Sequence, residues 1–263
     1  MTKPFLLLQL RPEDAASDDE YRAILRGAKL TSRDVVRVRM DQGFPDDIVL
    51  DDYAAVIVGG GPSNVSDSPA DKYPYQRLFE PRLRLLIGEI VRRDFPYLGI
   101  CYGMGILADT LGARVGTEQY GETPGAQTIT LTTAGTRDPL LLGLQRSFRA
   151  FVGHKEACQH VPAAAVLLAG AIDCPVQMFR SGRNVYATQF HPELDADGLA
   201  LRIRIYSERG YFATGEAEHL IADGRREEIT VPPVILSRFV ARYRSSAHDA
   251  PARHPDPDST LAR

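Results

Sequence analysis

The stretch PYLGICYGMGILAD, residues 96–109, joins a predicted strand to a predicted helix through a single cysteine. A short apolar run beginning at Tyr97 leads into Cys101, and an apolar stretch of helical character follows at once. Gly99 and Gly103 stand two residues to either side of the cysteine. A sharp strand-to-helix turn that exposes a nucleophile needs glycine at such positions, because side chains there would collide. The alternative is a buried structural cysteine with incidental glycines, and this window alone leaves both open.

The turn would also set the electrostatics of the thiol. It would place Cys101 at a helix N-terminus, where the helix dipole and free N–H groups lower the pKa of a thiol. The backbone N–H of Tyr102 would point at an oxyanion that develops beside the sulfur. On the functional interpretation, the sequence therefore predicts an activated thiol with one oxyanion donor beside it.

The first half of the chain alternates between strand-like and helix-like segments. Strands are predicted where apolar residues run almost continuously or alternate, and helices where apolar residues recur at helical spacing. In chain order these are strand 5–11, helix 17–30, strand 34–40, strand 53–61, helix 75–94, strand 96–101 and helix 102–112. This order predicts an α/β fold, with helices on both faces of a parallel sheet.

The middle of the chain favours further strands, and the end favours helices. The predicted strands are residues 126–132, 147–153, 165–171, 175–182 and 184–190, and the predicted helices are residues 198–210 and 232–244. Gly182 predicts a hairpin turn between the last two strands. Residues 245–263 are polar and proline-rich, which is typical of a disordered tail. We therefore expect one domain over residues 1–244, followed by that tail.

Composition excludes several classes of protein. The chain has 263 residues with a formal net charge of −3, which argues against general nucleic-acid binding. No apolar run approaches the length of a membrane span or resembles a signal peptide, so we expect no membrane association. The three cysteines are too irregularly spaced for a disulfide framework or a zinc site. We therefore expect a cytoplasmic protein with no metal and no cofactor.

A second chemical group lies in ATQFHPELD, residues 187–195. His191 follows a predicted strand, which would place it at the same sheet edge as Cys101. Glu193 lies two residues later, on the same side of an extended segment. An imidazole beside a thiol can accept its proton, and a carboxylate on the other ring nitrogen fixes the tautomer. The alternative is a surface histidine beside an exposed glutamate.

A third motif, VIVGGGPSN at residues 56–64, brings three glycines after a buried strand. Asn64 stands where a dinucleotide-binding loop would need its last glycine, and no Gly-Lys-Ser/Thr follows for a phosphate-binding loop. We expect Gly60 or Gly61 to supply a second backbone donor to an oxyanion, with a plain turn as the alternative.

Together, GGGPSN, GICYGM and QFHPE occur in the order and with the separations of one family, so the chain resembles the class I, triad-type glutamine amidotransferases. The resemblance covers about residues 5–195. It implies a flavodoxin-like three-layer α/β/α fold with a mostly parallel central sheet. It also implies Cys101 as nucleophile, His191 as general base and acid, and Glu193 as the orienting acid. The backbone N–H groups of Tyr102 and of the loop at Gly60 and Gly61 would form the oxyanion hole.

Smaller similarities narrow the subgroup and suggest residues that bind substrate. FVGHKE resembles the His-Gly-Asp stretch of the GMP synthetase amidotransferase domain, with His154 and Glu156 at its His and Asp positions. DCPVQMFRSG resembles the Cys-Pro-x-Gln-x-Phe stretch of the same subgroup. Two positions depart from the family. Gly105 stands where a substrate-holding glutamine is usual, and Gln119 stands where a glutamate is usual, with Glu118 one residue earlier. Both departures concern substrate recognition and leave the three catalytic candidates intact.

The resemblance implies hydrolysis of glutamine to glutamate and ammonia through a γ-glutamyl thioester. No ATP-pyrophosphatase loop follows residue 195, so ammonia would pass to a separate synthase. The first alternative is a stand-alone hydrolase of γ-glutamyl peptides or amides. The second is a non-catalytic binding module with the same fold, against which the intact Cys101, His191 and Glu193 argue.

Overall fold

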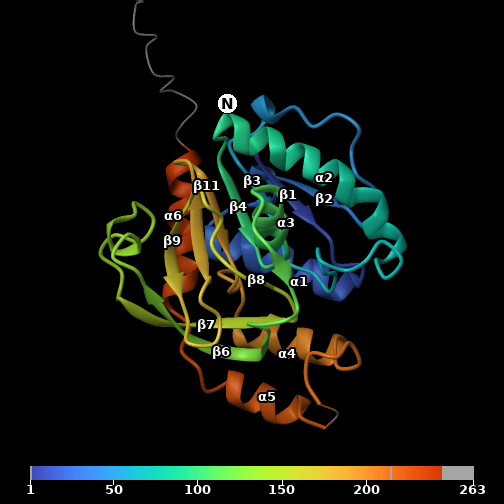
Figure 1. The fold of residues 1–263 in the computed structure, drawn as a ribbon, viewed down its shortest axis with the longest axis vertical. Coiled ribbons are helices and arrows are strands. Elements are labelled where there is room, and N and C mark those ends of the chain that lie inside the picture. Colours follow the sequence, from blue (N-terminus) through green and yellow to red (C-terminus); the bar gives the residue numbers. More distant parts are fainter. Residues whose placement is uncertain (1, 214, 245–263) are drawn as a thin grey trace, which may run out of the picture.

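In the computed structural model, which describes residues 2–213 and 215–244, a nine-stranded sheet organises the chain (Figure 1). In spatial order its strands are β2 (Val35–Arg39), β1 (Phe5–Gln9), β3 (Val56–Val58), β4 (Tyr97–Ile100), β11 (Val185–Thr188), β10 (Met178–Ser181), β9 (Ala165–Gly170), β6 (Glu122–Leu131) and β7 (Ser147–His154). A separate two-stranded sheet contains β5 (Val115–Gly116) and β8 (Ala157–Cys158). The predicted tail, residues 245–263, lies outside the described residues, and a single domain over residues 1–244 stays a prediction.

The parallel part of the sheet comes from the first half of the chain together with β11. The strands β2, β1, β3, β4 and β11 pair in parallel, each with its neighbour. Every residue of β1, β3, β4 and β11 is buried. Strands covered on both faces need such continuous apolar runs. The predicted parallel arrangement is therefore confirmed for this part of the sheet.

The middle of the chain extends the same sheet with antiparallel strands. β10 pairs with β11 through the predicted hairpin, in which Gly182 adopts a φ of +58°. β9, β6 and β7 continue the antiparallel pairing outward. The central sheet is thus mixed, and its parallel half carries the strand ends that hold the candidate catalytic residues.

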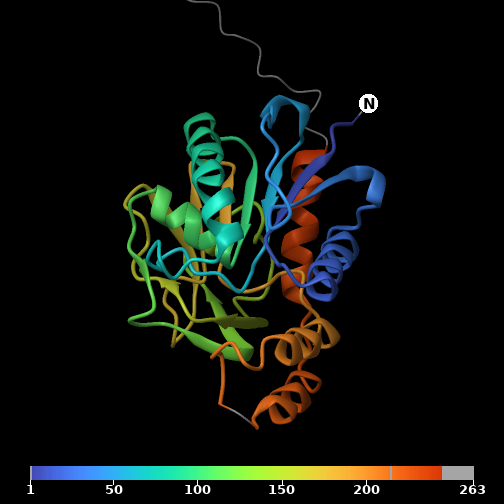
Figure 2. The same ribbon diagram turned by 90° about the vertical axis from the view of Figure 1, so that its right-hand side faces the viewer.

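Helices cover both faces of the sheet and give the three-layer α/β/α architecture that the sequence predicts. α1 (Asp14–Ala28) and α6 (Val231–Arg244) pack on one face, through apolar residues that include Ile24 and Leu236. The opposite face is covered by α2 (Pro74–Arg93) and α3 (Tyr102–Thr110). Figure 2 shows these two helix layers on either side of the sheet.

A third, smaller apolar cluster lies at the end of the molecule near β6 and β7. In it, apolar side chains of α4 (Ala196–Ile205) and α5 (Ala217–Gly224) pack with Phe151 of β7. The side chain of Asp195 caps α4 by accepting a hydrogen bond from the backbone N–H of Gly198 at 2.8 Å. This cluster supports the segment around residue 191.

The predicted elements differ from the observed ones mainly at their ends. α1 begins at Asp14, three residues before the predicted start, and α4 begins at Ala196. The strands β5 and β8 and the helix α5 escaped prediction, because two residues per strand and eight per helix give too little periodicity. Among the described residues, no helix has the length and apolar character needed to cross a membrane.

Candidate active site

The three sequence motifs lie at one edge of the sheet, because each follows one of three adjacent parallel strands, β3, β4 and β11. In register, Val58 of β3 pairs with Gly99 of β4, and Thr188 of β11 pairs with Ile100 of β4. The glycine-rich loop, Cys101 and the QFHPE segment each follow one of these strand ends. The carboxyl edge of such a sheet is the usual place for a ligand site.

Cys101 occupies a strained turn between β4 and α3. Its φ of 52° and ψ of −100° are values that side-chain-bearing residues rarely adopt. The flanking glycines are sterically required. A Cβ added at Gly99 would collide with the carbonyl oxygen of Gly103, and one at Gly103 would lie 2.5 Å from the carbonyl oxygen of Val58. The tight turn that the sequence predicts is therefore present.

His191 and Glu193 form a buried hydrogen-bonded pair. Nδ1 of His191 donates to Oε1 of Glu193 at 2.8 Å, which leaves the lone pair on Nε2. The backbone N–H of His191 also donates to the carbonyl oxygen of Phe151 at 2.9 Å, which fixes the segment against β7. The alternative of an exposed histidine beside an exposed glutamate is wrong, because both side chains are buried.

An arginine that the sequence analysis did not identify completes this pair. Arg202 of α4 donates to Oε1 of Glu193 at 3.0 Å, and its Nη1 lies 3.1 Å from Nδ1 of His191. Arg202 and Glu193 are both almost fully buried. The pKa of Glu193 lies well below its usual range, against the effect of burial, because His191 and Arg202 stabilise the carboxylate. No motif surrounds Arg202, so sequence patterns offered no signal for it.

The resting thiol is not the activated thiolate that the helix N-terminus alone predicts. Burial raises the pKa of Cys101 to about 12, although Arg11 and the backbone N–H of Tyr102 both act to lower it. Burial, with Arg202 and Arg11, also lowers the pKa of His191, although Glu193 raises it. The low polarity of the site thus outweighs the helix dipole. Both pKa shifts favour the neutral forms of the cysteine and the histidine at rest.

The glycine-rich loop lies directly against the side chains of Cys101 and His191. A Cβ added at Gly60 would lie 2.8 Å from Cε1 of His191 and 3.3 Å from Cβ of Cys101. At Gly61 it would lie 2.5 Å from Cδ1 of Leu10. Both positions exclude a side chain, so the backbone of the loop reaches the site, as a donor to an oxyanion requires.

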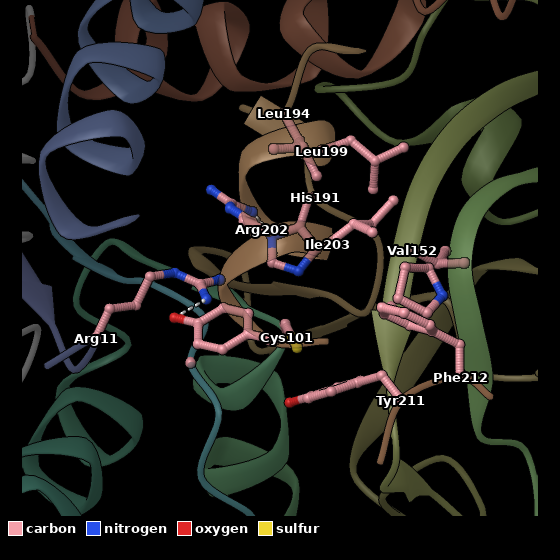
Figure 3. Close-up of a pocket in the computed structure, with 14 residues that line it drawn as sticks. Arg11, Cys101, Val152, His191, Leu194, Leu199, Arg202, Ile203, Tyr211 and Phe212 are labelled. Carbon is pink, nitrogen blue, oxygen red and sulfur yellow. Dashed lines mark hydrogen bonds between the residues drawn. The ribbon is translucent and has the colours of Figure 1, made fainter. Parts of the chain in front are cut away.

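Arg11 is a second residue that the sequence analysis missed. Its guanidinium is buried and donates to Oε1 of Glu20 at 3.1 Å and to the hydroxyl oxygen of Tyr206 at 3.1 Å. In Figure 3, Arg11 enters the pocket from the side opposite Val152, with its guanidinium hydrogen-bonded to the tyrosine hydroxyl. Its place after β1, at the same sheet edge, was a signal that could have identified it.

Two cavities meet at Cys101, and both are also lined by Gly61 and Tyr211. The first, shown in Figure 3, contains His191 and Arg202 and has a wall of apolar side chains. That wall is formed by Val152, Leu194, Leu199, Ile203 and Phe212. The second cavity is more polar and is lined by residues that include Ser63, Asn64, Glu156 and Gln189. A ligand with one polar and one apolar end could therefore occupy both cavities and pass beside Cys101.

The predicted substrate-binding residues divide into two groups. Gly105, His154 and Glu156 line the polar cavity together with Cys101. Gln119, by contrast, is exposed and is not among the residues that line either cavity. Its backbone carbonyl accepts a hydrogen bond from the side chain of Gln159 at 3.1 Å. A direct role of the Gln119 side chain in binding substrate therefore has no support from its position.

Glu156 takes up the space beside Gly105. Its carboxylate accepts hydrogen bonds from the backbone N–H groups of Val65 and Ser66 at 2.7 and 2.9 Å, and from the hydroxyl of Ser66 at 2.8 Å. A Cβ added at Gly105 would lie 3.3 Å from Oε1 of Glu156 and 3.4 Å from a methyl group of Val65. In this chain a longer side chain at position 105 would have to displace a carboxylate that secures the glycine-rich loop.

A family model described as "Glutamine amidotransferase class-I" matches residues 18–198. The chain is 36% identical over 107 residues to a Haloarcula marismortui protein that is named as one of the subunits of a glutamine-hydrolyzing GMP synthase, covering 40% of this chain and 55% of that protein. It is 34% identical over 177 residues to a glutamine-hydrolyzing GMP synthase of Thermus thermophilus, covering 66% of this chain and 31% of that protein. The matches thus span less than two thirds of these relatives' length.

Solved structures are similar over nearly the whole fold. A glutamine amidotransferase from Thermotoga maritima superposes with a TM-score of 0.73 at 22% identity, covering 93% of this chain and 100% of that one. One from Methylobacillus flagellatus gives a TM-score of 0.69 at 19% identity, covering 92% and 95% of the two chains. At such low identity, the similarity establishes the fold alone.

Proposed function

The chain belongs to the class-I glutamine amidotransferase family, and we propose that it is a cysteine hydrolase that releases ammonia from the side-chain amide of glutamine. One observation carries the proposal. The strained Cys101 turn and the buried His191–Glu193 pair meet at one sheet edge, on a cavity that both Cys101 and His191 line. A non-catalytic module would have no need to keep a strained backbone beside a buried, oriented imidazole.

The first half of the proposed reaction forms a thioester. Nε2 of His191 accepts the thiol proton while the sulfur of Cys101 attacks the amide carbon of glutamine. Glu193 stabilises the imidazolium that results. Backbone N–H groups of Tyr102 and of the Gly60–Gly61 loop donate to the oxyanion, each such donor contributing roughly 3 kcal/mol of barrier reduction. The imidazolium then protonates the departing nitrogen, the C–N bond breaks, and ammonia leaves.

The second half restores the enzyme. A water molecule gives a proton to Nε2 of His191 and attacks the γ-glutamyl thioester. The tetrahedral intermediate collapses with cleavage of the C–S bond, the imidazolium returns its proton to the sulfur, and glutamate is released. The three residues thus end the proposed cycle in their starting protonation states.

We propose that the polar cavity holds the amino-acid end of the substrate. Gly105, His154 and Glu156 are placed to shape it, although the carboxylate of Glu156 already accepts three hydrogen bonds from Val65 and Ser66. Its part is therefore to position the loop rather than to bind the substrate ammonium directly.

The proposed ammonia acceptor is a separate synthase. The relative from Haloarcula marismortui is named as one subunit of its synthase, which supports a two-chain arrangement for this protein too. Glutamate release should then be weak for the chain alone and should rise when the cognate synthase and its substrates are added. The test is a coupled assay of glutamate in both conditions. Equal rates with and without the synthase would argue against a partner.

A second substrate class is favoured by the apolar cavity beside Cys101. Ammonia is small and polar and does not require the apolar wall that includes Val152, Ile203 and Phe212. A γ-glutamyl amide with an apolar amine as leaving group would place that amine there. Turnover of γ-glutamyl-phenylalanine should then exceed turnover of glutamine without any partner. Phe212→Ala should reduce the first rate more than the second, and equal reductions would contradict this alternative.

A further inference from the structure

A compact group of buried, chemically reactive side chains lies outside the proposed triad. It contains Glu122 at the start of β6, His154 at the end of β7, and Cys174 in the turn between β9 and β10. All three are buried, and their ligand-type atoms lie within 4.8 Å of one another. Glu122 and His154 are register partners across the two strands. Their cluster, which we name the β6–β7 cluster, also includes Gln177.

The hydrogen bonds of His154 fix which nitrogen faces Glu122. Nδ1 lies 2.9 Å from the carbonyl oxygen of Glu156, which can only accept, so Nδ1 carries a proton and donates it. Nε2 lies 2.7 Å from Oε2 of Glu122. A backbone carbonyl that holds Nδ1–H in this way is the usual support for a histidine that binds metal through Nε2.

The cluster contains more acceptors than it can satisfy. Gln177 donates its side-chain amide to Oε2 of Glu122 at 2.7 Å. Within the described part of the chain, Oε1 of Glu122 and Oε1 of Gln177 are buried and have no hydrogen-bond partner. Glu122 forms no ion pair with a lysine or arginine of residues 2–213 and 215–244, and its one partner at ion-pair distance there is the imidazole of His154. A buried carboxylate and a buried amide oxygen left unpaired are costly, and a cation would satisfy both.

We propose that the β6–β7 cluster binds one divalent transition-metal ion, with zinc the best fit. Imidazole, thiolate and carboxylate are the ligands that zinc takes in proteins, with bond lengths of about 2.0–2.3 Å. The metal replaces the proton now shared by His154 and Glu122, and it displaces the thiol proton of Cys174 to solvent. Reorientation of the Gln177 amide presents its oxygen as a fourth ligand.

The proposed site is structural. Its ligands come from three segments that the sequence separates widely, so the spacing of the cysteines gave no indication of it. A metal here would tie the β9–β10 turn to the β6–β7 ladder. His154 also lines the polar cavity beside Cys101, so the ion would stabilise one wall of that cavity without touching the reacting atoms.

Metal binding is measured directly on the purified full chain, stripped with a chelator and then loaded with Zn²⁺ and desalted. Elemental analysis should give one zinc per chain. With Co²⁺ as probe, a thiolate-to-cobalt charge-transfer band should appear, together with the visible absorption of a four-coordinate ion. Cys174→Ser should abolish the charge-transfer band, and Glu122→Gln should lower the zinc content at least tenfold.

Cys158→Ser is the matched control, because Cys158 is also buried but donates its thiol to the carbonyl oxygen of His160 outside the cluster. It should retain both zinc and the cobalt band. Circular dichroism of each variant checks folding, and the wild-type measurement does not depend on any variant. Less than about a tenth of an equivalent of zinc on loaded wild-type protein, or a cobalt band that survives Cys174→Ser, would overturn the proposal. Neither measurement depends on glutamate release, so the proposed function is tested separately.

Discussion

The reactivity of Cys101 rests on its access and its neighbours rather than on a low resting pKa. Cys101 is partly exposed, whereas Cys158 and Cys174 are buried. Burial raises the pKa of all three thiols. We therefore expect iodoacetamide to modify Cys101 at least tenfold faster than the other two, because it is the least buried of the three. Peptide mass spectrometry after timed quenching measures this, and equal labelling of the three sites in folded protein would contradict it.

His191 sets the acid limit of the proposed reaction. Its pKa lies below the ordinary 6.5, chiefly because of burial, and the base must be neutral. The kcat/KM for glutamate release should therefore stay constant as the pH falls to 6.5 and decline only at lower pH. The free energy of unfolding should also fall as the pH is lowered, because the unfolded chain takes up this proton at a higher pH than buried His191 does. A pH–rate profile that already falls by half above pH 6.5 would contradict this assignment.

Arg202 should keep the His191 pKa low and Glu193 ionised. Arg202→Met removes the nearest cation, so the acid limb of kcat/KM should move to higher pH as the pKa of His191 rises. Loss of a buried partner should also lower the free energy of unfolding by about 3 kcal/mol. Arg204→Met is the control on the same helix, because Arg204 is largely exposed and its pair with Glu218 spans 3.7 Å. An unchanged pH profile for Arg202→Met would show that Arg202 serves only structure.

Among the elements, the turn between β4 and α3 has a strict steric requirement at both of its glycines. Gly103→Ala would bring a methyl group against the carbonyl oxygen of Val58, so it should cost about 2 kcal/mol of stability or more and reduce activity. Gly88→Ala is the matched control within α2, since no atom lies within 4 Å of the added Cβ. It should be neutral or stabilise by up to about 1 kcal/mol. Chemical denaturation measures the free energy of unfolding of both variants. Equal values would contradict a steric requirement for glycine at position 103.

The sequence predicted the elements that have strong local patterns. Continuous apolar runs indicated β1, β3 and β4, and the glycines around Cys101 indicated the turn, because each feature lies within a few residues. Arg11 and Arg202 escaped prediction because they stand outside the recognised motifs, although each pairs with a carboxylate nine residues away. The β6–β7 cluster escaped prediction because its residues come from distant segments that only the folded sheet brings together. The low thiol pKa expected from the helix N-terminus was wrong for a similar reason. Burial is a property of the whole fold, and it outweighs the local dipole.

For the whole molecule, the parallel and antiparallel halves of one sheet contribute different residues to the candidate site. The parallel half, common to many α/β proteins, holds Cys101, the glycine-rich loop and His191 at adjacent strand ends. The antiparallel extension contributes His154 from β7 to the polar cavity and Val152 to the apolar one. On the proposed function, the reacting residues and part of the substrate pocket thus come from different halves of the sheet, so one can vary without the other.

The most direct test of the central claim is glutamate release by wild-type protein and by Cys101→Ala, with glutamine and γ-glutamyl-phenylalanine as substrates. The wild-type chain should release glutamate from at least one of them. The variant should lose at least about 10³-fold in kcat, because the nucleophile is absent. Its thermal unfolding should stay within a few degrees of wild type, since the change removes one sulfur atom. A correctly folded Cys101→Ala protein that releases glutamate at the wild-type rate would contradict the account.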